Sequence, residues 1–387
     1  MSEKLTRPPA NKLLGLELLR FVAAFGVLIW HYQHFAYVGG KAVGLVREQL
    51  PFYGLLQWFY DGGLYGVWIF WCISGFIFFW KYREPIDNRS IGAKEFFVFR
   101  FSRLYPLHLV TLLLVAGLQV AYFHLNDFFF VYQANDLRHF LLQVLMASNW
   151  GFEHGDSFDG PIWSISVEVL VYVVFFVMLR FVTGSALLNV VIIIACVNAR
   201  LIHAPGMVFD CLAFFYIGGL AAIARRAVAA AQRGAIDNVA WAVLGVFCLL
   251  SWSFALARFD LFAYGFLLIG TPILLFCISR DISVSAATQR LIEAAGNMTY
   301  SSYLLHFPIQ LVIALGFAIV GAPIPYYHAA FFVIFVTTTL LASYLTYRGF
   351  EAPAQNIIRR RLLRRPGNAM PVAALAEIGR AMPRKAD

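Results

Sequence analysis

The sequence predicts an all-α fold, a polytopic membrane bundle of about ten transmembrane helices. Of the 387 residues, 61% are hydrophobic and 13% are charged, and the mean hydropathy is +0.72. Soluble domains average about 45–50% apolar and about 25% charged residues. The apolar residues form continuous runs of about 20, the length of a membrane-spanning helix, and do not alternate as in a β-barrel. These observations exclude a soluble enzyme, a disordered chain and a disulfide-rich secreted module.

Ten apolar segments account for this helix count. A further run, residues 137–147, is too short to span a bilayer and is expected to lie at an interface. No cleavable signal peptide is predicted, because the first apolar run continues through Arg20 and His31 without a small-residue cleavage site. The ten predicted spans are 13–31, 62–81, 104–123, 161–181, 186–203, 207–224, 239–257, 260–279, 299–320 and 328–347.

The distribution of basic residues predicts the orientation of the bundle. If the N-terminus lies inside, only five of the 30 Lys and Arg residues fall on outer connections. Positive residues accumulate on the cytoplasmic side of membrane proteins, so both termini are predicted to be cytoplasmic. We expect a transmembrane domain over residues 1–353 and a basic cytoplasmic tail over residues 354–387, which anionic lipid attracts. This topology accounts for the net charge of +9, and no nucleic-acid partner is expected.

The cysteines give no sign of a metal site. All five lie inside or at the edge of apolar segments, and no pair has the spacing of metal ligands. We interpret them as packing residues, and no metal is expected.

The first apolar segment contains two polar residues that are costly in a membrane and therefore candidates for function. Arg20 and His31 are 11 residues apart, so on a helix they point in nearly the same direction and are separated by about 16 Å along the axis. This arrangement suggests the two ends of one narrow site. The alternative is that Arg20 pairs with Glu17, three residues earlier, and that His31 is an interfacial histidine.

Two further segments add charged groups. Arg100 and Arg103 lie on nearly one face at the inner entry to the third segment, where the alternative is a simple positive-inside signal. Glu168 lies about two turns in from the outer surface, a depth that matches His31. A carboxylate at such a depth needs a cationic partner or a proton. We therefore predict that a pair between Glu168 and His31 is geometrically possible.

The second and ninth segments are less specific. Ser74 is followed by Gly75, and such small residues permit a close approach between helices. His306 lies about two turns from the inner surface, where a lone histidine is more often a packing residue than a functional one.

Together these segments resemble the acyltransferase 3 family, bacterial inner-membrane proteins that O-acylate glycans and other secreted molecules. The resemblance extends over about residues 12–353. Glu17 stands where many members have Asp. Six motifs carry the resemblance: Glu17 with Arg20 and His31, Ile73 to Phe76, Arg100 to Pro106, Trp163 to Glu168, Tyr300 to Pro308, and Tyr347 to Pro353.

The resemblance implies an acyl-coenzyme A donor on the cytoplasmic side, with acetyl-coenzyme A as the expected one. Its phosphates would be bound by Arg20, Arg100 and Arg103. The acceptor would be a hydroxyl of an extracytoplasmic or membrane-associated glycan: a polysaccharide, an O-antigen or an oligosaccharide. The expected location is the bacterial inner membrane, with the lipid bilayer as the surrounding partner, and no oligomeric state is predicted.

His31 and Glu168 are the expected catalytic residues. His31 would act either as a general base or as a transient acyl carrier, and Glu168 would orient it or balance its charge. The expected supporting residues are Glu17, Ser74, Trp163, Ser164, Tyr300, His306 and Arg348.

Two kinds of alternative remain open from the sequence. A secondary transporter or flippase would use the same intramembrane Arg, Glu and His residues as proton relays or counter-ions, although no inverted repeat is evident. Within the family, the protein could transfer succinyl groups or acylate a secreted small molecule. A purely structural scaffold gives no reason to keep charges in the bilayer.

Overall fold

The all-α prediction is confirmed. The computed structural model describes residues 13–202, 206–228, 233–255, 265–280 and 282–363. It is 79% helical, and its sheet is one antiparallel pair of two-residue strands in which Tyr37 pairs with Ala42 and Val38 with Lys41.

The elements follow one another in a simple order. The strands and short helical turns are η1 (Tyr32–Ala36), β1 (Tyr37–Val38), β2 (Lys41–Ala42), η2 (Arg47–Gln49), η3 (Gly160–Ile162), η5 (Phe266–Gly270) and η6 (Tyr347–Glu351). The α-helices are α1 (Leu14–His31), α2 (Tyr53–Gly62), α3 (Tyr65–Asp87), α4 (Ala93–Asn126), α5 (Leu137–Val144), α6 (Trp163–Phe181), α7 (Ala186–Leu201), α8 (Val208–Ala227), α9 (Arg233–Ala255), α11 (Thr271–Ile278), α12 (Ala286–Asn297), α13 (Thr299–Val320), α14 (Ala329–Thr346) and α15 (Ala352–Leu362).

Among the described residues, the number of candidate spans is lower than the predicted ten. Within the described ranges, seven helices are long and apolar enough to cross a membrane, or eight if α2 and α3, bent by 65°, form one span. The predicted segment 186–203 forms α7, whose 16 residues rise about 24 Å, less than the hydrocarbon core of about 30 Å. The predicted segment 260–279 contributes the short apolar helix Phe266–Ile278, and its residues 260–264 lie outside the described ranges. Within the described ranges, two of the predicted spans are thus represented by apolar helices shorter than 18 residues.

The closest helix contact joins α3 and α8. A Cβ atom placed on Gly75 would lie 1.8 Å from the carbonyl oxygen of Phe215, and one placed on Gly218 would lie 1.9 Å from the carbonyl oxygen of Cys72. The two backbones therefore touch, as the small residue after Ser74 predicted. This contact anchors an aromatic core in which Phe78 stacks on Tyr172 with ring centroids 4.4 Å apart.

Helices α1 and α13 run side by side and parallel, and two contacts set their register. Arg20 on α1 donates a hydrogen bond to Thr299 on α13 (3.1 Å). The Gln310 side chain on α13 donates to the carbonyl of His31 on α1 (2.8 Å). The two contacts are separated by 11 residues on α1 and by 11 residues on α13. Polar groups therefore line up along the boundary between the two helices, the α1–α13 seam.

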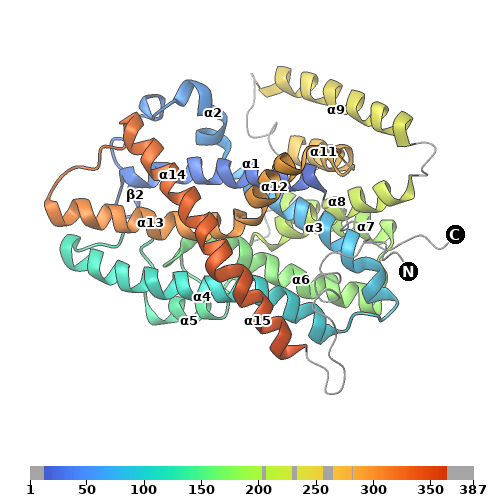
Figure 1. Cartoon of the computed structure of the whole chain (residues 1–387), viewed down its shortest axis with the longest axis horizontal. Coiled ribbons are helices and arrows are strands. Elements are labelled where there is room, and N and C mark those ends of the chain that lie inside the picture. The colour runs from blue at the N-terminus through green and yellow to red at the C-terminus, as the bar shows by residue number, and fades with distance from the viewer. Residues whose placement is uncertain (1–12, 203–205, 229–232, 256–264, 281, 364–387) are drawn as a thin grey trace, which may run out of the picture.

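The chain continues as a helix beyond the predicted domain boundary at residue 353. Residues Ala329–Leu362 form one long helical segment, with a π-helical turn at η6 between α14 and α15. Figure 1 shows it crossing the bundle as a diagonal, and α15 packs against α4. Residues 354–363 are thus packed onto the bundle, whereas residues 364–387 of the predicted tail lie outside the described ranges.

Candidate active site

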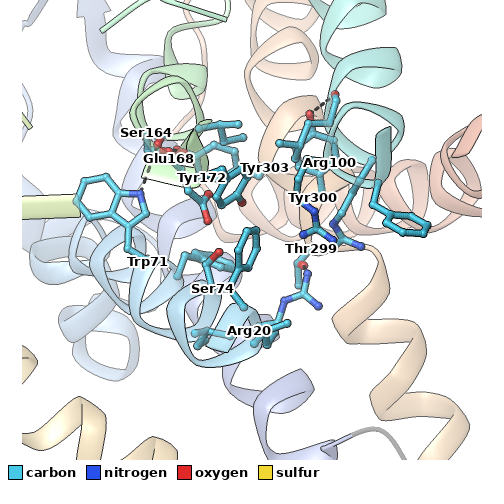
Figure 2. Close-up of a pocket in the computed structure, with 18 of the residues that line it drawn as sticks. Arg20, Trp71, Ser74, Arg100, Ser164, Glu168, Tyr172, Thr299, Tyr300 and Tyr303 are labelled. Atoms are coloured by element: carbon cyan, nitrogen blue, oxygen red, sulfur yellow. Dashed lines mark hydrogen bonds between the residues drawn. The ribbon is translucent and has the colours of Figure 1, made fainter. Parts of the chain in front are cut away.

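A cavity of about 300 Å³ opens between α1, α3, α4, α6, α13 and α15 (Figure 2). Its described lining contains five cations and two carboxylates, Glu17 and Glu168. This excess of positive charge in a largely apolar bundle indicates a site for an anionic ligand. The five cations are Arg20, Lys81, Arg100, Arg103 and Arg359.

Arg20 satisfies both interpretations that the sequence left open. Its guanidinium forms an ion pair with Glu17 (3.0 Å), as the spacing of three residues suggested. It also lines the cavity and donates to the hydroxyl of Thr299 (3.1 Å). Because Glu17 and Thr299 hold the guanidinium from two helices, Arg20 is fixed at the cavity wall (Figure 2).

Arg100 and Arg103 line the same cavity. Arg100 donates to the Tyr82 hydroxyl (2.8 Å) and lies over the rings of Phe78 and Tyr82, 4.8 and 5.3 Å from their centroids. Its Nε–H is buried without a hydrogen-bond partner among the described residues. These contacts orient the guanidinium and leave it without a carboxylate partner within the described ranges.

The predicted pair between Glu168 and His31 is wrong. Glu168 lines the arginine cavity, where it interacts with the hydroxyls of Ser74 and Tyr172 (Figure 2). The positive charges of Arg100 and Arg103 attract its carboxylate. A matching depth does not specify the direction in which a side chain points. Helix α6 presents Glu168 toward α3, whereas the neighbours of His31 are on α1, η1 and α13.

His31 instead belongs to a cluster of three buried imidazoles, His31, His34 and His306. The ring centroid of His31 is 4.6 Å from that of His306 and 4.8 Å from that of His34. His306 is therefore not an isolated packing residue. This histidine cluster joins the two parallel helices at the end of the seam opposite Arg20.

Backbone contacts fix the tautomers of two of these rings. His31 Nδ1 is 2.8 Å from the Val27 carbonyl, and His306 Nδ1 is 3.1 Å from the Ser302 carbonyl. A carbonyl only accepts, so both Nδ1 atoms carry the proton and each Nε2 has a free lone pair. The Nε2 atom of His306 is buried without a partner in the described structure. The cluster therefore offers basic nitrogens.

Tyr303 and Ser164 separate the cavity from the histidine cluster. The two hydroxyls are 2.7 Å apart, and Tyr303 also contacts the Pro161 carbonyl (2.7 Å). Both residues line the cavity, and the ring centroid of Tyr303 is 6.1 Å from that of His306. The cavity thus ends one aromatic ring from the imidazoles.

The other predicted supporting residues divide into two groups. Tyr300 lines the cavity, and its hydroxyl donates to the Leu104 carbonyl (2.5 Å). Trp163 packs edge-on against Trp71, which is itself a lining residue, with ring centroids 5.9 Å apart. Arg348 is not among the described lining residues. It is exposed and donates to the Tyr344 hydroxyl (2.8 Å).

The comparisons with known proteins bear on this arrangement. The family model described as an acyltransferase domain, acyltransferase 3, matches residues 13–348. The chain belongs to the acyltransferase 3 family. It is also 30% identical over 111 residues to an uncharacterized protein of Haemophilus influenzae, a match that covers 28% of this chain and 45% of that protein. The chain thus aligns with less than half of that relative's length. No solved structure matches the chain.

Membership of the acyltransferase 3 family makes this protein a membrane acyltransferase. Residues from five of the six motifs that resembled the family line the cavity or join the histidine cluster. The sixth motif contributes through Glu351, whose carboxylate accepts a hydrogen bond from Ser301 (2.6 Å) and attracts Arg103.

Several lining residues of the acyltransferase were missed by the sequence reasoning. Two had a usable signal, because Tyr172 follows Glu168 by one helical turn and Thr299 precedes Tyr300. Arg359 had no such signal in the sequence, since it lies beyond the family motifs in a segment interpreted as a basic tail. The lining residues that were missed include Lys81, Tyr172, Thr299, Tyr303, Gln355 and Arg359.

One buried carboxyl outside the cavity predicts a pH dependence of stability. Asp159 is fully buried, and neither carboxyl oxygen has a hydrogen-bond partner among the described residues. Burial raises its pKa from 3.8 to about 7. Between about pH 4 and pH 7 the folded protein therefore keeps a proton on Asp159 that the unfolded chain has lost. The contribution of this carboxyl to stability is complete at acidic pH and decreases as the pH rises from about 4 to about 7. At about 1.4 kcal/mol per pKa unit, the loss amounts to a few kcal/mol.

Asp159→Asn should remove this loss. We expect thermal unfolding in detergent to show the variant more stable than wild type at neutral pH, with a difference that shrinks toward acidic pH. A difference that stays constant across this range would contradict the assignment.

Proposed function

We propose that this acyltransferase moves an acyl group, preferably acetyl, from cytoplasmic acyl-coenzyme A to a hydroxyl of a glycan outside the bacterial inner membrane. The observation that supports this most is the joint arrangement of the cationic cavity and the histidine cluster. One end of the α1–α13 seam is suited to an anion, and the other end carries unprotonated imidazole nitrogens.

The cationic end of the cavity fits the phosphates of coenzyme A. Guanidinium groups bind phosphate through two parallel charge-assisted hydrogen bonds. Arg20, Arg100 and Arg103 come from two helices and surround one opening. In this proposal the arginine end faces the cytoplasm, where acyl-coenzyme A is available.

The acyl-pantetheine arm would extend along the seam toward the histidine cluster. Arg20 and His31 are separated by about 16 Å of helix axis, so a long and thin ligand is required to connect them. In this proposal the hydrogen bond between Ser164 and Tyr303 lies across that path and must open. Rotation of the Tyr303 side chain would open it.

The proposed chemistry uses the free Nε2 lone pair of His31. As a general base, this nitrogen takes the proton of the acceptor hydroxyl while the oxygen attacks the thioester carbonyl. The carbon–sulfur bond breaks, and the thiolate of coenzyme A receives the proton. In the alternative route Nε2 attacks the thioester carbonyl, and the carbon–sulfur bond breaks to release the thiolate of coenzyme A. The acceptor oxygen then takes the acyl group from Nε2, and the hydroxyl proton passes to the thiolate. Glu168 is assigned to the donor end, because it faces the arginines.

The donor assignment is tested with purified protein and acetyl-coenzyme A. Arg100→Gln should raise the KM for acetyl-coenzyme A by about ten- to a hundredfold, because a hydrogen bond to a charged group contributes about 1.5–3 kcal/mol. Arg290→Gln, which removes an exposed cation on α12, is the control and should leave KM unchanged. Wild-type protein that neither binds coenzyme A nor releases it from acetyl-coenzyme A would refute the proposed function and favour a transporter.

The acceptor is tested in cells. Deletion of the gene should remove one acetyl group per modified unit from a surface glycan, detected as a mass shift. A succinyl-sized shift, or a shift in a secreted small molecule, would identify the corresponding alternative.

A further inference from the structure

Arg359 is a cation of the cavity that comes from outside the region matched by the family. The family match ends at residue 348, whereas Arg359 lies on α15, which continues the last long helix and packs on α4. Its Nε–H donates to the Ser102 hydroxyl (3.0 Å), and one of its Nη groups donates to the side-chain oxygen of Gln355 (3.1 Å). Its guanidinium lies 5.4 Å from the centroid of the Phe99 ring.

These contacts hold the guanidinium without neutralising it. Ser102, Gln355 and Phe99 carry no charge, and no ion pair of the described residues involves Arg359. Its charged neighbours include Arg100 and Arg103, which repel it. A partly buried cation held beside two others is unfavourable unless an anion completes the site.

The charge balance of the whole cavity leads to the same conclusion. Among the described lining residues, four arginines face two carboxylates, and counting the nearby Glu351 still leaves one positive charge in excess. One of these cations is Arg359. A ligand with several negative charges would remove the excess.

We propose that Arg359 binds a phosphate group of the donor, so that α15 completes the donor site which the family region alone leaves open. This inference rests on the proposed function, because it takes acyl-coenzyme A as the donor. The phosphate-bearing part of the donor lies at α15, and the pantetheine arm extends from there toward Tyr303.

The test compares two donors that share a thioester. Acetyl-coenzyme A carries phosphates, and acetyl-pantetheine carries none. Arg359→Gln should lower kcat/KM for acetyl-coenzyme A about tenfold, through KM, and leave kcat/KM for acetyl-pantetheine unchanged. Arg359→Lys should retain most of the wild-type kcat/KM for acetyl-coenzyme A, because lysine keeps the positive charge. Arg359→Met, whose side chain still packs on Phe99, replaces the Gln variant if the latter does not fold.

The matched control is Arg360→Gln, which removes the same charge from the adjacent, exposed position of α15 and should behave as wild type. Equal losses with both donors would show that Arg359 only supports the packing of α15 and would overturn the inference. Wild-type kinetics of Arg359→Gln would also overturn it. Failure of wild-type protein with acetyl-coenzyme A itself would instead refute the proposed function.

Discussion

Replacing His31 by alanine is expected to lower acyl transfer by about 100- to 10,000-fold, the usual contribution of a general acid or base. His31 is buried, its Nδ1–H is held by the Val27 carbonyl, and its Nε2 is the free basic nitrogen beside His306. Alanine removes that nitrogen and cannot carry an acyl group. The measurement is release of coenzyme A in the presence of acceptor, by protein of equal membrane abundance.

Coenzyme A should still bind to His31→Ala with the affinity of wild type. His31 is not among the described residues that line the arginine cavity, which ends at Tyr303. His328→Ala, at an exposed position before α14, is the control and should transfer acyl groups normally. Wild-type transfer by His31→Ala would exclude both roles proposed for this residue.

A second measurement separates those two roles. Wild-type protein is given radiolabelled acetyl-coenzyme A without acceptor, and the protein is then isolated. Label retained by wild type and absent from His31→Ala indicates an acyl carrier. Release that requires acceptor, with no retained label, indicates a general base.

The largest effect on stability is expected for Gly75→Ala. The added Cβ would lie 1.8 Å from the Phe215 carbonyl oxygen, which belongs to the backbone of α8. Overpacking of this kind typically costs about 1–3 kcal/mol, and here relief requires moving a whole helix. We expect a lower unfolding temperature in detergent and a smaller folded yield. Gly218→Ala, on the other side of the same contact, should have a similar effect.

Gly117→Ala is the matched control for this prediction. Gly117 lies in α4, and a Cβ placed there would meet no atom within 4 Å. Because alanine favours a helix over glycine by about 1 kcal/mol, this variant should be as stable as wild type or more stable. If Gly75→Ala unfolds at the same temperature as Gly117→Ala, α3 and α8 do not pack as described.

The helical membrane fold could be predicted because its signal is local along the chain. A run of about 20 apolar residues can satisfy its backbone in lipid only as a helix or within a closed barrel. The same signal did not distinguish α7 from a full span, because most of residues 186–203 are apolar, while the helix itself ends at Leu201. A helix end depends on caps and neighbours as well as on hydropathy.

The arginines of the site were predictable for a similar reason. A charge inside an apolar run is conspicuous, so Arg20 and His31 stood out, and their spacing of 11 residues placed them on one helical face. Glu168 stood out equally, but its partner could not be inferred. Depth follows from the position in the sequence, whereas direction depends on how α6 is rotated against α3.

The sequence by itself determined that this protein is an all-helical membrane protein with the motifs of an acyltransferase and with a small set of buried polar residues. These properties depend on composition and on spacing within single helices. Only the tertiary structure decided which residues meet: Glu168 with Ser74 and Tyr172, His31 with His306, and Arg359 with the other cavity cations. Contacts between helices depend on their rotation and register, which are set by packing such as that of Gly75 against Phe215.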